Sequence, residues 1–456
     1  MTADSKPMAS PNAAPPSLQE AIDKAGSPMK LLWKPNSRPA VVPVIQPEYA
    51  GWRKEQAAYN TSAAFSDLSH HMSDLFIEGP DATRLLMDVS ANSYENFVLG
   101  QAKQFVPVTK QGLIITDGIL MRDAEQKYNL SGVPAAQNWV RYHGITGKYD
   151  VAFEIDPDSS NRKTGNPKQF RYQIQGPNAL AVVQCCFGGP LPRTKFFHST
   201  PVSLGGRNFR AFRHGMAGTP GYEFIGDWQD AQFVKDELFK AGEAFNMIHI
   251  GGKAYYTNGI ESGWIPTPTP AIYTAPELQD YRRFVSLYSF EGMRGLHGSY
   301  FSENIEDYYV SPYELGYGKS VAFNHDFIGR EALEKAKDNV PRTKVTLVFN
   351  PDDVKKVFGA DHDFILSYAR YRVEAGAALA GMTFYTAFID PAKTILALAL
   401  VDNKFSQPGT EVTVTWGEHP GFGTDPDADL GFPRLRARVD VSPYSEVART
   451  TYRQNP

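Results

Sequence analysis

Two short segments carry a histidine or an acid where chemistry is possible. In Ser69-His70-His71-Met72, His71 could change its charge near neutral pH or orient a phenolic or ether oxygen. A hydrogen-bonded structural histidine explains the same pattern. In Thr116 to Leu120, Asp117 ends an apolar run and could hold a nitrogen base, or could simply start a turn.

Two further segments could hold a flat ligand. Between Arg213 and Gly221, three glycines and one proline occur within nine residues, so the backbone can approach a ligand closely. Glu223 follows, and its carboxylate could pair with a donor–donor ring edge such as that of a 2-amino-4-oxopterin. In residues 255–264, Tyr255 could relay a proton and Trp264 could flank the ring. A surface glutamate and an aromatic core cluster are the alternatives.

The composition excludes several classes of function. The chain has 456 residues, with 46 Lys+Arg against 50 Asp+Glu, so we expect neither nucleic acid nor an anionic membrane surface as a partner. The longest apolar run, Ile395 to Val401, has the length of a strand rather than of a membrane span. The first 26 residues have no apolar core typical of a signal peptide, and Cys185 and Cys186 are adjacent. We therefore expect a cytoplasmic protein without disulfides.

No metal-binding motif is evident. HExxH and paired CxxC motifs are absent from the sequence, and His70-His71 has poor metal spacing. The prediction is that the protein holds no metal.

The elements that must position these residues follow a repeated pattern. Residues 74–78 predict a strand that leads through Gly79-Pro80-Asp81 into a helix over residues 82–89. Residues 171–175 predict a second strand, which leads through Gly176-Pro177-Asn178 into another helix. The two turns are 97 residues apart, which indicates an internal duplication unless a common turn has arisen twice.

The pattern changes after about residue 340. Strands separated by Pro, Gly and Asp turns are predicted over residues 344–349, 383–388, 394–401, 411–416 and 435–441, typical of a β-barrel or sandwich. Because strands and helices alternate irregularly along the whole chain, the predicted fold class is α+β. Residues 316–333 predict a strand, a turn and a capped helix, which we interpret as a domain junction.

The motifs SHHM, RHGMAG, ESGWIP and DFIGREAL, in this order, resemble the aminomethyltransferase family, the glycine-cleavage T-protein and its relatives. Within it, the chain is most similar to the tetrahydrofolate-dependent O-demethylases of lignin-derived aromatics. The resemblance implies a three-domain cloverleaf around a central tunnel. Its expected parts are a flexible tail (1–27), a duplicated α+β folate-binding region of two interleaved domains (28–340) and a C-terminal β-barrel domain (341–456).

The resemblance also implies roles for individual residues. Glu223 and Gln173 would hold the pterin of tetrahydrofolate, Trp264 would stack against the folate and Phe196 would line its site. Tyr255 matches the catalytic tyrosine between the methyl donor and N5 of the folate. His71 matches a substrate-side histidine, and Asp117 falls where the T-protein keeps its functional acid.

The implied reaction converts an aryl methyl ether and tetrahydrofolate into a phenol and 5-methyltetrahydrofolate. Vanillate-type enzymes carry an arginine and a tyrosine where this chain has Val133 and Val42. Because Val133 cannot pair with a carboxylate, the substitutions favour a drier ring substituent, as in a chlorinated methoxybenzoate such as dicamba, or an uncharged methoxyarene. Vanillate or syringate, an aminomethyl donor, the sulfonium dimethylsulfoniopropionate and a non-catalytic folate-binding role remain alternatives.

Overall fold

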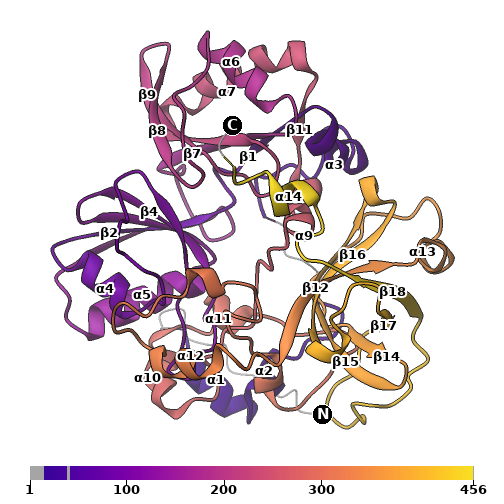
Figure 1. Cartoon of the computed structure of the whole chain (residues 1–456). Coiled ribbons are helices and arrows are strands. Elements are labelled where there is room, and N and C mark those ends of the chain that lie inside the picture. The colour runs from indigo at the N-terminus through magenta and orange to yellow at the C-terminus, as the bar shows by residue number, and fades with distance from the viewer. Residues whose placement is uncertain (1–14, 38–41, 455–456) are drawn as a thin grey trace, which may run out of the picture.

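A computed structural model of the chain describes residues 15–37 and 42–454. Three sheets form three lobes arranged around a common centre (Figure 1). The first lobe holds a sheet in the order β3-β4-β5-β2-β6. Its strands are β2 (Ser73–Glu78), β3 (Ala102–Phe105), β4 (Gly118–Ala124), β5 (Lys127–Gly132) and β6 (Ala152–Asp156), and its helices are α4 (Ala82–Asp88) and α5 (Pro134–Thr146).

The second lobe holds a sheet in the order β11-β1-β7-β10-β9-β8. Its strands are β1 (Ala63–Asp67), β7 (Gln169–Gln175), β8 (Ser199–Leu204), β9 (Arg207–Phe212), β10 (Gly221–Asp227) and β11 (Met247–Ile250). Its helices are α3 (Trp52–Thr61), α6 (Ala179–Phe187), α7 (Ala231–Gly242), α8 (Gly252–Tyr255) and α9 (Asn258–Ser262).

The first two lobes repeat one topology. The neighbours β2-β5-β4-β3 in one sheet correspond to β7-β10-β9-β8 in the other, and each sheet has its two main helices after the equivalent strands. The turns after β2 and β7 are equivalent, with Gly79 at φ +147° and Gly176 at φ +119°, conformations that favour glycine. Strand β1, from before the first lobe in sequence, is inserted into the second sheet, so the two lobes are interleaved.

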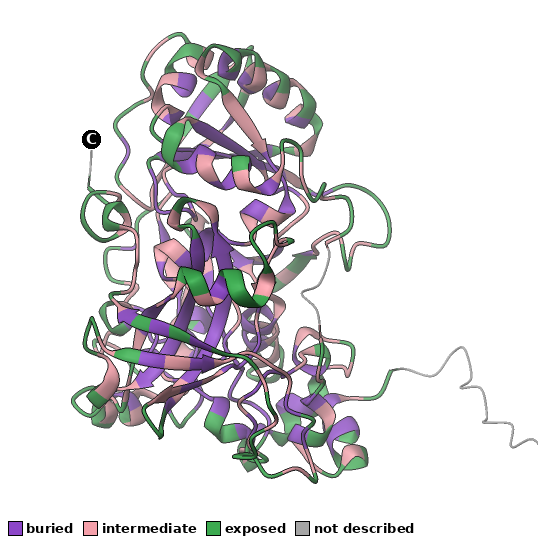
Figure 2. Cartoon of the chain, turned by 90° about the vertical axis from the view of Figure 1, so that its right-hand side faces the viewer, coloured by how far each residue is buried: buried purple, intermediate pink, exposed green. Residues whose placement is uncertain are grey.

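The third lobe is a closed barrel. Its strands run β15-β14-β17-β18-β12-β16, and a further pairing of β15 with β16 closes the ring. The bounds are β12 (Arg342–Phe349), β13 (Leu366–Ser367), β14 (Arg372–Ala375), β15 (Ala378–Ile389), β16 (Thr394–Asp402), β17 (Glu411–Thr415) and β18 (Arg434–Asp440), with α13 (Pro351–Phe358) outside. The predicted α+β class and C-terminal barrel are confirmed. Buried residues concentrate on the strands, whereas the outer helices carry exposed faces (Figure 2).

The remaining helices join the lobes: α1 (Leu18–Ala25), α2 (Pro28–Leu32), α10 (Gln279–Phe284), α11 (Phe290–Met293), α12 (Arg330–Ala336) and α14 (Glu446–Thr450). The expected tail, residues 1–27, falls partly on residues 1–14, which lie outside the described residues. Within its described part, α1 has a capping box at Ser17 and packs against α10, with Leu18 fully buried.

Residues 316–333 differ from the sequence prediction. A 3-10 turn at Gly318–Ser320 stands where a strand was expected, and α12 begins without a side-chain cap. Its N-cap is Gly329, at φ +92°, where an added Cβ would lie 2.3 Å from the carbonyl oxygen of Thr109. The close approach of two backbones, rather than a capping side chain, therefore fixes the start of this helix.

Candidate functional site

Two predicted folate-site residues are direct neighbours. Gln173 on β7 and Glu223 on β10 are opposite each other in the antiparallel register. The Gln173 Nε2 donates to Oε2 of Glu223 at 3.0 Å, and both residues are buried. The alternation of the strand places both side chains on one face of the sheet. Glu223 is therefore not the surface glutamate that the sequence left open as an alternative.

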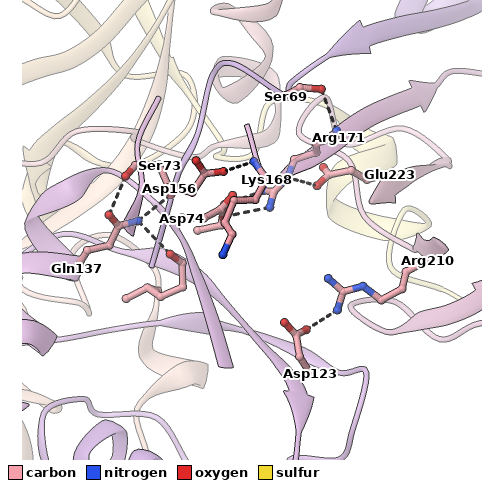
Figure 3. Close-up of polar contacts among 12 residues, drawn as sticks. Ser69, Ser73, Asp74, Asp123, Gln137, Asp156, Lys168, Arg171, Arg210 and Glu223 are labelled. Atoms are coloured by element: carbon pink, nitrogen blue, oxygen red, sulfur yellow. Dashed lines mark hydrogen bonds and ion pairs between the residues drawn. The ribbon is translucent and has the colours of Figure 1, made fainter. Parts of the chain in front are cut away.

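A buried arginine extends this pair toward the first lobe (Figure 3). Arg171 Nε lies 3.5 Å from Oε1 of Glu223, and its Nη2 lies 3.2 Å from Oδ1 of Asp74. Its Nη1 donates to Oγ of Ser131 at 2.7 Å. Burial raises the pKa of Glu223, while Arg171 and Gln173 offset part of that rise. The arginine therefore links β7 and β10 of the second lobe to β2 and β5 of the first.

The glycine-rich loop before β10 packs tightly under the same sheet. An added Cβ on Gly215 would lie 1.7 Å from Nε2 of Gln175. That Nε2 donates to the Thr219 carbonyl at 2.9 Å, and the Gly215 amide donates to the Tyr452 hydroxyl at 2.8 Å. The glycines thus let this loop approach the sheet and the C-terminal segment at van der Waals distance.

Tyr255 and His71 meet although 184 residues separate them in sequence. Their rings lie 4.7 Å apart at 85°, and Tyr256 Oη lies 3.3 Å from Nδ1 of His71. Burial lowers the pKa of His71 to about 4, so the imidazole is neutral near pH 7. Burial, and then Glu223, raise the pKa of Tyr255 well above its ordinary value of 10. Tyr255 therefore keeps its proton and can act as a hydrogen-bond donor.

Asp117 forms a second acceptor group. Its Oδ2 accepts from Trp264 Nε1 at 2.8 Å and from Gln104 Nε2 at 2.7 Å. Its Oδ1 is buried and has no hydrogen-bond partner in residues 15–37 and 42–454. Burial raises the pKa of this carboxyl group. Trp264 is therefore held by a hydrogen bond to Asp117, unlike a tryptophan that only packs in an aromatic core.

Three further predicted site residues lie next to the ends of neighbouring strands in the first sheet. Ser73 at the start of β2 pairs with Gly132 at the end of β5, and Gly132 pairs with Gly118 at the start of β4. His71, Val133 and Asp117 each stand one or two residues beyond these strand ends. Residues 113–117 precede β4 as a loop, and the Ile114 amide donates to the Val310 carbonyl at 2.9 Å.

Phe196 and Val42 lie at the margins of this arrangement. Phe196 stacks on Phe197 with centroids 4.5 Å apart and meets the Tyr452 ring at 5.0 Å. Val42 is partly exposed, and its neighbour Pro43 accepts a hydrogen bond from Ser159, whose amide donates to the His70 carbonyl at 3.0 Å. Ser159 thus connects Pro43, the residue after Val42, to the main chain of His70, the residue before His71.

Sequence reasoning missed three polar residues of the site: Arg171, Gln104 and Tyr256. The signal for Arg171 was present, because it stands two residues before Gln173 and so shares its face of the strand. Tyr256 adjoins Tyr255, but the sequence does not say which of two consecutive tyrosines faces the histidine. No local pattern marks Gln104.

Comparison with known proteins establishes the family. Residues 33–268 match the GCVT N-terminal domain. The chain belongs to this family. Over 450 residues it is 37% identical to the syringate O-demethylase of Sphingobium sp. (strain NBRC 103272 / SYK-6), covering 96% of this chain and 97% of that protein. It is 27% identical to the sesamin methylene transferase of Sinomonas sp. (strain No.22), covering 87% and 89% of the two chains.

The fold comparison agrees. The glycine cleavage system aminomethyltransferase T from Bartonella henselae superposes with a TM-score of 0.62 at 17% identity, covering 94% of this chain and 96% of that one. The predicted aminomethyltransferase fold is confirmed, and this GCVT-family chain is an enzyme of the one-carbon methyltransferase class.

The described residues contain no group of three or more His, Cys, Asp and Glu side chains that could hold a metal. Among them, no helix combines the length and apolar character needed to cross a bilayer.

Proposed function

We propose that this GCVT-family enzyme is a tetrahydrofolate-dependent O-demethylase that takes the methyl group of a methoxybenzoate. The observation that carries the proposal is the meeting of Tyr255 and His71, with ring centroids 4.7 Å apart, next to the buried Glu223–Gln173 pair. The 37% identity to a syringate O-demethylase over nearly the whole chain supports the same reaction class. Degradation of a methoxylated aromatic compound is the corresponding cellular role.

The polar atoms of the site fit a folate. Among the described residues, the side chain of Glu223 accepts one hydrogen bond, from Gln173, and its Oε1 forms an ion pair with Arg171 at 3.5 Å. In the same residues, Gln173 Oε1 and Asp117 Oδ1 are buried without a hydrogen-bond partner. All of these atoms are acceptors, and a reduced pterin presents several N–H donors. Buried acceptors without donors are costly, so a ligand rich in N–H groups would satisfy them. Bound there, tetrahydrofolate would supply the nitrogen that receives the methyl group.

We assign to Tyr255 the donation of a proton to the ether oxygen. A phenolate is a poor leaving group, so breaking the methyl–oxygen bond requires a donor near that oxygen. Tyr255 holds its proton because burial and Glu223 raise its pKa. Its hydroxyl could donate to the departing oxygen, while neutral His71 and the Tyr256 hydroxyl orient the ring substituents.

We infer that the substrate is a methoxybenzoate with apolar ring substituents, such as a chlorinated one of the dicamba type. Val133, the N-cap of α5, and Val42 supply no charge. His71 is neutral at physiological pH and so offers a carboxylate one N–H donor but no positive charge.

A substrate panel tests the proposal. Purified enzyme and tetrahydrofolate would be incubated without oxygen with vanillate, syringate, dicamba, guaiacol or dimethylsulfoniopropionate, and 5-methyltetrahydrofolate would be quantified. We expect product from at least one aryl ether. Product from dimethylsulfoniopropionate alone would move the assignment to sulfonium donors. No product from the whole panel, with tetrahydrofolate still bound, would contradict the proposed reaction.

A further inference from the structure

Two arginines lie side by side at the junction of α11 and the barrel without an acidic partner. Arg294 follows α11, and Arg370 lies between β13 and β14. In the part of the chain that the structure describes, neither makes a salt bridge. Arg294 Nη2 donates to the Thr267 carbonyl and Arg370 Nη2 donates to the Thr269 hydroxyl at 3.4 Å, so both arginines bind the same short segment. Burial, and then the charge of Arg294, lower the pKa of Arg370. An anion beside Arg294 would relieve the repulsion between the two groups.

The guanidinium group of Arg370 is held by contacts within the protein. Its Nη1 donates to the carbonyls of Tyr368 at 2.8 Å and Phe384 at 3.3 Å, and its guanidinium lies 4.2 Å from the Phe384 ring centroid. Only 1% of the residue is exposed. Both terminal nitrogens of its guanidinium are thus bound by the protein, and only its Nε lacks a partner among the described residues.

Arg294 is different because most of its donors are not used. Its Nη2 donates to the Thr267 carbonyl, whereas its Nε is buried and has no hydrogen-bond partner among the described residues. The nearest acid in sequence, Glu291, is engaged by Asn138 Nδ2 at 3.1 Å and by the Tyr281 hydroxyl at 2.7 Å. Burial lowers the pKa of Arg294 only to about 10, so it is cationic at neutral pH.

A chain of aromatic contacts connects Arg294 to the candidate active site. Arg370 Nη1 donates to the Tyr368 carbonyl at 2.8 Å, so Tyr368 adjoins the two arginines. The Tyr368 ring stacks on Tyr385 with centroids 5.3 Å apart, and the Tyr385 hydroxyl donates to the Tyr256 carbonyl. Tyr256 is the residue whose hydroxyl lies 3.3 Å from His71. A run of contacts through Tyr368, Tyr385 and Tyr256 therefore leads from the two arginines to His71.

The helix that precedes Arg294 also adjoins the element that carries Val133, where vanillate-type enzymes have an arginine. Helix α11 packs against α5, the helix whose N-cap is Val133, and Asn138 joins the two through Glu291. Vanillate-type enzymes carry an arginine at the position of Val133. In this chain, Arg294 at the end of α11 supplies a guanidinium group instead.

We propose that Arg294 is the specificity residue that binds the carboxylate of the methoxybenzoate substrate. The inference rests on the proposed function and names the class of substrate: an aryl methyl ether that carries an anionic group. A guanidinium offers two parallel N–H donors to a carboxylate, and Arg294 Nε and Nη1 can form that pair while Nη2 keeps its bond to Thr267.

The test compares an anionic and an uncharged substrate in one set of variants. The enzyme, Arg294→Met and Arg294→Lys would be assayed with 2-methoxybenzoate or its dichloro derivative and with methoxybenzene, with 5-methyltetrahydrofolate as the readout. Arg283→Met, on an exposed side chain that pairs only with Asp280, is the matched control. Binding of the demethylated benzoate, followed by calorimetry, provides a readout that does not depend on turnover.

We expect Arg294→Met to raise KM for the methoxybenzoate and Kd for the product about 10- to 100-fold, as loss of a charged hydrogen-bonded pair does. Turnover of methoxybenzene should stay within about twofold, and Arg294→Lys should recover part of the affinity. Equal losses on both substrates, or unchanged affinity for the benzoate, would overturn the role of Arg294. Failure of the unmodified enzyme on every aryl ether would instead contradict the proposed function itself.

Discussion

At the scale of single residues, the site is defined by side chains whose ionisation is set by burial. His71 stays neutral, Tyr255 stays protonated, and Glu223 shares its charge with Arg171. Each state suits the proposed reaction, because the ether oxygen needs a proton donor and a pterin needs acceptors. Removing one group should therefore affect one step and leave the others.

Replacing Tyr255 by phenylalanine should reduce turnover by about 10²- to 10⁴-fold, the usual range for loss of a general acid or base. Folate binding should survive, since the Glu223–Gln173 pair is unchanged. The measurement is the single-turnover rate of 5-methyltetrahydrofolate formation, with Tyr288→Phe at an exposed position as the control. A normal rate in Tyr255→Phe would remove its catalytic role.

Replacing Glu223 by glutamine should weaken tetrahydrofolate binding about 10- to 100-fold, because a charged acceptor contributes about 1.5–3 kcal/mol more than no bond at all. Arg171 keeps Asp74 as a partner, so the fold should persist. Equilibrium titration of the folate measures the effect, and Glu303→Gln on the exposed surface is the matched control. Identical affinities in the two variants would exclude Glu223 from the pterin site.

At the scale of elements, the strands and helices that carry the site could largely be predicted from the sequence. The repeated strand-turn-helix pattern and the strands after residue 340 correspond to β2, α4, β7, α6 and the barrel strands. Their signals are local: alternation, periodicity and turn residues. The start of α12 was not predictable, because a backbone contact between Gly329 and Thr109 determines it. The domain boundaries at residues 27 and 340 remain predictions.

Gly176→Ala should destabilise the protein by about 1–3 kcal/mol, since φ is +119° and the added Cβ would lie 2.8 Å from the Ser62 carbonyl oxygen. Gly189→Ala, where no heavy atom lies within 4 Å of the added Cβ, should be nearly neutral. Urea denaturation of both variants measures the difference. Equal stabilities would show that the turn after β7 does not require glycine.

At the scale of the whole molecule, the site exists only because the lobes meet. Arg171 of the second lobe reaches Asp74 of the first, and Tyr255 meets His71. The resemblance to a known family predicted most of these residues, whereas spacing alone could not have joined positions so far apart in sequence. Arg171 and Arg294 were missed because their importance lies in which partners they have, or lack, in three dimensions.

Acid should destabilise the whole molecule through its buried histidines, His71, His143, His214 and His249, whose pKa values burial lowers to about 4, 4, 3 and 4. Each folded pKa lies below the ordinary 6.5, so the unfolded chain binds more protons and stability falls as pH drops from about 6.5 toward 4.

His143, which packs on Trp139 away from the catalytic pair, isolates this effect. The lowered pKa of His143 corresponds to about 3 kcal/mol of folding stability lost as the pH falls from about 6.5 to about 4. The variant His143→Gln should lose less stability between pH 7.5 and pH 5 than the unmodified protein, as measured by urea denaturation at both values. An unchanged pH dependence would mean that His143 titrates normally in the folded state.

The most direct test of the central claim is isotopic. The methoxybenzoate preferred in the substrate panel would carry ¹³C in its methyl group and would be mixed with excess enzyme and tetrahydrofolate without oxygen. The account predicts that the ¹³C appears on N5 of the folate in a one-to-one ratio with the phenol. Label in methanol or formaldehyde, or phenol formed without labelled 5-methyltetrahydrofolate, would contradict methyl transfer to folate.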